Sequence, residues 1–156
     1  QHLAAVCLDV WEHEPLVNTE LAQVIALATP HIAGYSLEGK WRGTEMIYQA
    51  LCHFLQIPTQ HQLADFLPKV THKLVWPNLD SLWANYAALL RQTYPIEHDN
   101  QAFRQSLLLP TAERGLAFDT LRKHYWPRRE SSAYDLYLTP SSWVEPMTQL
   151  GFKIIV

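Results

Sequence analysis

An uninterrupted apolar run at residues 3–8, Leu-Ala-Ala-Val-Cys-Leu, most constrains how this chain can fold. A strand buried on both faces of a parallel sheet has this kind of sequence, whereas a half-exposed strand alternates apolar and polar residues. Such a strand needs neighbours on both sides. We therefore predict an α/β fold and expect the chain to be the C-terminal part of a longer protein.

Residues 1–57 form the first predicted region. Asn18 or Thr19 can cap a short helix, and residues 24–28 either continue it or form a second short strand. Ser36 is a predicted N-cap for a longer helix that ends before Pro58. One face of that helix is expected to be buried because apolar side chains recur every three or four residues: Leu37, Trp41, Thr44, Tyr48, Leu51 and Leu55.

Residues 58–156 form a second region with a different charge balance. Residues 1–57 hold two basic and six acidic side chains, whereas residues 58–156 hold ten and nine. Strands are predicted at three places in this region and helices between them, which indicates a small α+β unit with its own core. The predicted strands are 70–76, 134–138 and 151–156, and the predicted helices follow Asn78 or Asp80, cover 100–108 and 111–125, and start at a Ser142–Glu145 capping box.

Composition excludes several classes of protein. The net charge is −3, so no basic face indicates binding to nucleic acid or to an anionic membrane. The longest apolar runs are far shorter than the ~20 residues of a membrane span. Two cysteines suit a reducing compartment, and we expect a cytoplasmic globular protein. The eight histidines lack metal-ligand spacing, so no metal site is expected.

Three polar residues follow the two predicted strands of the first region. Asp9 ends the first strand, Glu14 lies in the next loop and His31 follows the second apolar segment. Open α/β sheets bind ligands at the carboxyl ends of their strands. A histidine oriented by a carboxylate can act as a general acid or base. The alternative is that His31 only stabilises a loop and Glu14 is a solvated surface acid.

The motifs around these residues resemble the D-isomer-specific 2-hydroxyacid dehydrogenases. The sequence Asp-Val-Trp-Glu-His-Glu-Pro at 9–15 and the sequence Thr-Pro-His-Ile-Ala-Gly at 29–34 carry the resemblance. It implies that residues 1–57 are the end of a Rossmann-type NAD-binding and catalytic core. It also implies that His31 is the catalytic acid/base and that Glu14 orients it.

The same resemblance implies further ligand contacts. Asp9 and Gly34 would contact the NAD cofactor, and Tyr35 would contact the substrate. The run at 34–44 is similar to one branch of the family that acts on a phosphorylated sugar acid on the route to pyridoxal 5'-phosphate. Lys40 and Arg42 are candidates for holding the phosphate of that substrate.

Members of that branch add a C-terminal dimerisation domain. The resemblance therefore implies that residues 58–156 are such a domain and that the protein is a homodimer. The region around Trp76 and Trp83 is the predicted contact face, because tryptophans are common anchors at interfaces.

Two other functions remain open at this point. The chain could be an interaction or ligand-sensing module without chemistry, or part of a dehydrogenase for another D-2-hydroxy acid. None of the five glycines forms a GxGxxG or P-loop motif. The Gly-rich loop and the family's catalytic arginine would precede residue 1. We therefore expect the 156 residues alone to bind NAD poorly and to be inactive.

Overall fold

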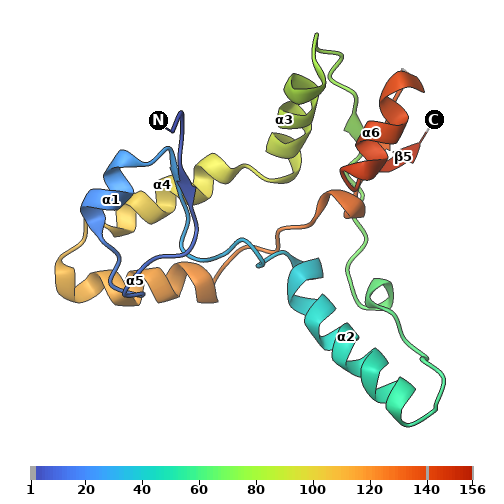
Figure 1. The fold of residues 1–156 in the computed structure, drawn as a ribbon, viewed down its shortest axis with the longest axis horizontal. Helices are drawn as coiled ribbons and strands as arrows, with labels where there is room; N and C mark the ends of the chain where they lie inside the picture. Colours follow the sequence, from blue (N-terminus) through green and yellow to red (C-terminus); the bar gives the residue numbers. More distant parts are fainter. Residues whose placement is uncertain (1–2, 140, 156) are drawn as a thin grey trace. The chain divides into compact units, whose positions relative to one another are not determined.

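A computed structural model describes residues 3–139 and 141–155 (Figure 1). Helices and parallel strands are mixed along the chain, as an α/β fold predicts. The chain forms two compact units, and each is discontinuous in sequence. Residues 3–35 and 95–126 make the first unit, and residues 36–94 and 127–155 make the second.

The first unit is built on a pair of short parallel strands. Strand β1 (Cys7–Leu8) pairs with β2 (Leu27–Ala28), and helix α1 (Thr19–Val24) lies between them in sequence. The side chain of Asn18 accepts a hydrogen bond from the Leu21 N–H, which confirms the predicted cap of α1. The second short strand is confirmed as well.

The first strand is shorter than predicted. Regular pairing begins only at Cys7, and Leu3 is 82% exposed rather than buried. Among the described residues β2 is the single strand paired with β1, so the start of the apolar run has no sheet on either side. The expected burial of residues 3–8 is therefore wrong for this structure.

Helices α4 (Ile96–Ser106) and α5 (Thr111–Lys123) complete the first unit. Figure 1 shows α4 beside the β1–β2 pair, and the two helices pack against each other. The shared core is mostly aromatic and aliphatic: Trp11, Val17, Ala22, Ile25, Ala28, Phe103 and Phe118. These helices lie in the predicted second region, yet they share a core with residues 3–35, so the compact units are not divided at residues 57 and 58.

The second unit contains a three-stranded parallel sheet. Strands β3 (Leu74–Val75), β4 (Asp135–Tyr137) and β5 (Lys153–Ile155) lie in that order, and α3 (Leu82–Thr93) and α6 (Val144–Gln149) precede β4 and β5 respectively. A second apolar core forms here: Leu74, Trp76, Leu89, Tyr134, Leu136, Leu138, Met147 and Phe152. The predicted strands are thus present, although Val156 at the end of the last one lies outside the described residues.

Helix α2 (Leu37–Phe54) starts at the predicted cap, since the Ser36 hydroxyl accepts from the Gly39 N–H. Its predicted apolar face, however, is largely exposed. Trp41 is 44% and Leu51 is 52% exposed, although the short 3-10 turn η1 (Leu63–Asp65) packs against α2. Periodicity finds a helix and its apolar face, but the burial of that face depends on what packs on it.

Two predicted caps differ in the structure. The cap of α3 is Ser81 rather than Asn78 or Asp80, and Asn78 instead occupies a left-handed turn with φ of 58°. Helix α6 begins after the turn η3 (Ser141–Trp143) and has no side-chain cap, so the predicted capping box is wrong.

An ion pair anchors the start of α2 within the second unit. The Arg129 guanidinium donates to Glu38 at 2.7 Å, and the Glu130 N–H donates to the other oxygen of the same carboxylate. Glu38 is only 5% exposed, so its charge is compensated within the protein rather than by water. The turn η2 (Ser131–Ala133) follows directly.

No helix within residues 3–139 and 141–155 has the length and apolar content needed to cross a membrane.

Truncation of Phe103 tests whether α4 belongs to the first core. Phe103→Ala should lower the unfolding free energy by about 3–5 kcal/mol, because the buried ring would leave a cavity. Phe54→Ala is the matched control, since Phe54 is also helical but 80% exposed, and it should change stability by about 0.5 kcal/mol or less. Urea unfolding of the intact protein measures both. Equal losses for the two variants would contradict the assigned core.

Candidate active site

The loops after β1 and β2 bring Glu14 and His31 together. The His31 Nδ1 atom lies 2.8 Å from the Glu14 Oε2 atom. The two loops meet because parallel neighbouring strands end at the same edge of a sheet. The sequence prediction that these two residues act as a pair is therefore consistent with the geometry.

Trp11 holds the Glu14 carboxylate in this position. The Trp11 N–H donates to Glu14 Oε1 at 2.9 Å, so both carboxylate oxygens are engaged. The Trp11 indole N–H donates to the backbone oxygen of Thr29 at 2.9 Å. From the sequence, Trp11 was used only as part of the motif at residues 9–15, and this role was missed. A tryptophan directly after a strand in an otherwise polar segment is the signal that could have revealed it.

Asp9 organises the loop that carries His31. Its carboxylate accepts hydrogen bonds from the Thr29 hydroxyl at 2.7 Å, the Ile32 N–H at 2.8 Å and the Ala33 N–H at 3.0 Å. Hydrogen bonds to a charged acceptor are stronger than those between neutral groups. Asp9 therefore closes the loop over residues 29–33 around His31. A contact between Asp9 and the cofactor would add to these bonds and stays a prediction.

The backbone at His31 needs such support. Its φ is 56°, in the left-handed region that non-glycine residues adopt at a cost of about 1–2 kcal/mol. The bonds from Asp9 to the two following N–H groups fix the chain directly after His31. Residues held in such conformations cluster at functional sites.

The pair has the geometry of a general base with an orienting carboxylate. An ionised carboxylate can only accept, so in the neutral imidazole that donates its Nδ1–H to Glu14 the Nε2 atom is the acceptor. The His31 side chain is 45% exposed and that of Glu14 is 20% exposed. The ring is thus open to a ligand while its orienting partner is more shielded.

Gly34 and Tyr35 follow directly in sequence. A Cβ atom built at Gly34 would meet no atom within 4 Å, so the space next to this backbone is open. The Tyr35 ring packs edge-on against Tyr125 at 6.0 Å, and the Arg122 guanidinium lies 5.5 Å from its centre. The roles of Gly34 toward NAD and of Tyr35 toward substrate stay predictions.

The two candidates for the substrate phosphate lie on α2. Arg42 is 3.7 Å from Glu130 and is 56% exposed on its side chain. Lys40 and Arg42 belong to the second unit, and their role stays a prediction. Among the described residues no three histidine, cysteine, aspartate or glutamate side chains gather as a metal site would require.

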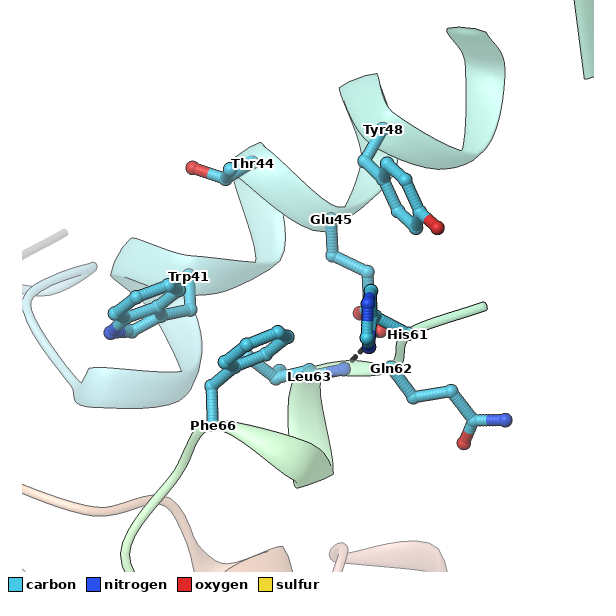
Figure 2. A pocket seen from close by; sticks show the side chains of 8 residues that line it. All are labelled: Trp41, Thr44, Glu45, Tyr48, His61, Gln62, Leu63 and Phe66. Carbon is cyan, nitrogen blue, oxygen red and sulfur yellow. Dashed lines mark hydrogen bonds between the residues drawn. The ribbon is translucent and has the colours of Figure 1, made fainter. Parts of the chain in front are cut away.

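A separate pocket of about 240 Å³ lies between α2 and η1 in the second unit (Figure 2). Trp41 and Phe66 stack at one side, with ring centres 6.0 Å apart. The pocket contains an acid, Glu45, but its carboxylate accepts from the Leu63 N–H at 2.6 Å, as the dashed line in Figure 2 shows. The walls are mainly apolar, and the His61 ring on one of them packs edge-on against Phe66 with ring centres 5.6 Å apart.

The Asp9 bonds can be tested by amide hydrogen exchange. In Asp9→Asn the charge is lost and one oxygen can no longer accept, so exchange at Ile32 and Ala33 should accelerate about tenfold or more. Glu12→Gln is the control, because Glu12 is an exposed carboxylate in the neighbouring loop. Unchanged exchange at both amides in Asp9→Asn would contradict the role of Asp9 in closing the loop over residues 29–33.

Comparison with known proteins shows which family this chain belongs to. Residues 66–151 match the model of a domain of unknown function (DUF3410). Erythronate-4-phosphate dehydrogenase of Pseudomonas syringae pv. tomato DC3000 is 49% identical over 147 residues, which are 92% of this chain and 37% of that protein. Erythronate-4-phosphate dehydrogenase of Pseudomonas putida GB-1 is 51% identical over 125 residues, 79% of this chain and 33% of that protein.

The chain thus spans about a third of the length of the curated relatives that it matches. In the first of these comparisons the similarity extends over 92% of the chain. With more than half of its residues inside the matched domain, this chain belongs to the DUF3410 family.

Proposed function

We propose that the intact protein containing this chain is an NAD-dependent dehydrogenase. It oxidises 4-phospho-D-erythronate to (R)-3-hydroxy-2-oxo-4-phosphobutanoate in pyridoxal 5'-phosphate biosynthesis. The 2.8 Å contact between His31 and Glu14 carries the catalytic part of this proposal. The name shared by the similar Pseudomonas proteins supports the substrate.

His31 performs the proton transfer of the reaction. Its Nε2 atom accepts the proton of the C2 hydroxyl while the C2 hydrogen leaves as a hydride, so the C–O single bond becomes a carbonyl. The bound NAD supplies the acceptor for that hydride. The Glu14 carboxylate stabilises the positive charge that forms on the imidazole and keeps Nε2 directed at the substrate.

The residues of this chain are proposed to contact only the nicotinamide end of the cofactor. Residues 1–57 are proposed to be the end of a Rossmann-type NAD-binding core, with Asp9 and the open backbone at Gly34 near the nicotinamide. No Gly-rich phosphate loop occurs in these 156 residues. Tyr35 is proposed to line the substrate site, and Lys40 or Arg42 to hold the phosphate. The proposed location is the cytoplasm.

Two alternatives stand beside this proposal. A dehydrogenase for another D-2-hydroxy acid would use the same Glu14–His31 pair with a different substrate. A non-catalytic interaction or ligand-sensing module would need neither residue. Comparing the activity on several D-2-hydroxy acids distinguishes the first alternative from the proposal. Substituting His31 and measuring the remaining activity distinguishes the second.

A matched pair of histidine substitutions tests the catalytic role. His31→Asn should lower kcat on 4-phosphoerythronate by about 10²- to 10⁴-fold, because asparagine cannot act as a base. His13→Asn is the control, since His13 is exposed in the neighbouring loop and has a φ of 59°, close to that of His31. Asparagine tolerates this left-handed backbone at both positions. NADH formation in the intact protein measures both rates.

Glycerate, 3-phosphoglycerate and lactate are the comparison substrates for the same assay. Activity confined to 4-phosphoerythronate and lost only in His31→Asn supports the proposal. Activity on another acid instead would favour the first alternative, a dehydrogenase for a different D-2-hydroxy acid. Equal activity of the two variants would refute His31 as the catalytic base.

The second unit is proposed to contribute to a homodimer. Of the two tryptophans named from the sequence, Trp76 is 6% exposed and belongs to the core, whereas Trp83 on α3 is 71% exposed. Trp83 is therefore the one whose ring is available to a partner subunit. Large aromatic side chains at interface centres often contribute most of the binding energy.

Light scattering tests this surface. Trp83→Ser should raise the dissociation constant of the dimer about tenfold or more. Leu108→Ser is the control, because Leu108 is 79% exposed in the first unit. An unchanged dissociation constant for Trp83→Ser, or a monomeric parent protein, would contradict the proposed interface.

A further inference from the structure

Helices α4 and α5 lie inside the matched domain of unknown function, yet they pack on the segments that carry Glu14 and His31. We name residues 96–123 the α4–α5 hairpin. Its partners are β1, β2 and the loops that follow them, all within the first unit. A dimerisation role does not account for these contacts.

Polar side chains of α4 hold the backbone that leads to His31. The Asn100 Oδ1 atom accepts from the Ala28 N–H at 2.9 Å, three residues before His31. The Arg104 guanidinium donates to the same Asn100 oxygen at 2.9 Å and to the backbone oxygens of Ala22 and Ile25 at 2.6 and 2.8 Å. The bonds to Ala28, Ala22 and Ile25 join residues more than 70 positions apart in sequence.

Aromatic side chains of the hairpin support the loop of Glu14. The Phe103 ring lies 5.4 Å from the Trp11 ring, and the Phe118 ring lies 5.9 Å from Phe103. Both phenylalanines are at most 2% exposed. Trp11 in turn donates to Glu14, so the packing of the hairpin reaches the carboxylate through one residue.

Gly115 on α5 lies against the two residues that follow Glu14. A Cβ atom built at Gly115 would lie 3.3 Å from the Pro15 Cγ atom and 3.6 Å from the Leu16 Cδ2 atom. Pro15 follows Glu14 directly and has a ring that cannot rotate away as a long flexible side chain can. Any side chain at residue 115 therefore presses on the segment that contains Glu14.

We propose that the α4–α5 hairpin positions the Glu14–His31 pair. Gly115 is a positioning residue in this proposal, because the absence of a side chain there lets Pro15 take a position from which Glu14 contacts His31. The inference rests on the proposed function. It assigns this part of the domain of unknown function the role of holding Glu14 and His31 in their relative positions. Displacing a catalytic group by about 1 Å can cost about 10²-fold in rate.

Two glycine substitutions in the intact protein provide the test. Gly115→Val adds branched bulk against Pro15, and Gly115→Ala adds a single methyl group. Gly43→Val is the matched control, because Gly43 lies inside helix α2 and a Cβ there meets no atom within 4 Å. Valine has the same helix propensity at both positions, so the control removes that effect.

The kinetic readout is the split between kcat and KM on 4-phosphoerythronate. Gly115→Val should lower kcat about tenfold or more relative to Gly43→Val with little change in KM, since the pair acts mainly in the transition state. Gly115→Ala should give a smaller loss in the same direction. If Gly115→Val fails to fold, the comparison of Gly115→Ala with Gly43→Ala decides the question.

The ¹⁵N signals of the His31 ring in the substrate-free protein give a readout that does not depend on activity. They should shift in Gly115→Val and stay unchanged in Gly43→Val. Unshifted signals with kcat equal to that of the control would overturn the positioning role and leave the proposed function intact. A parent protein inactive on 4-phosphoerythronate would refute the proposed function, and the His31 signals would still decide the positioning role.

Discussion

The carboxylate of Asp9 is the interaction on which the candidate site depends. It accepts three hydrogen bonds from the loop at residues 29–33, two of them from the N–H groups that directly follow His31. These bonds offset the cost of the left-handed backbone at His31. Without them, the backbone that carries the imidazole toward Glu14 would lose this support. The geometry of the pair is thus set by a third residue that need not itself take part in proton transfer.

Other residues of the first unit support the same two loops from further away. Trp11 joins the loop of Glu14 to the loop of His31 through its backbone and its indole N–H. Phe103 and Phe118 pack behind Trp11, and Asn100 binds the end of β2. Residues that are far along the chain therefore complete the surroundings of motifs near its beginning. This arrangement explains why the compact units do not follow the order of the sequence.

The sequence predicts what is decided locally. Caps such as Asn18 and Ser36 follow from side chains that bond their own helix. The pairing of Glu14 with His31 was expected from their places after two strands and from the family resemblance. Burial is decided by distant partners, so the apolar face of α2 was expected to be buried and is exposed. The support from Asn100 was not predictable for the same reason, because a side chain that bonds a backbone group 72 residues away leaves no periodic signal.

The protonation pattern of His31 tests the central claim most directly. Heteronuclear NMR of the intact protein distinguishes the two nitrogens of a neutral imidazole. If Glu14 orients His31 as the 2.8 Å contact indicates, the proton lies on Nδ1 and Nε2 is the free acceptor. In Glu14→Gln this preference should weaken, because the charged acceptor is gone. A ring protonated on Nε2 in the parent protein would contradict the account, since the atom meant to accept the substrate proton would already carry one.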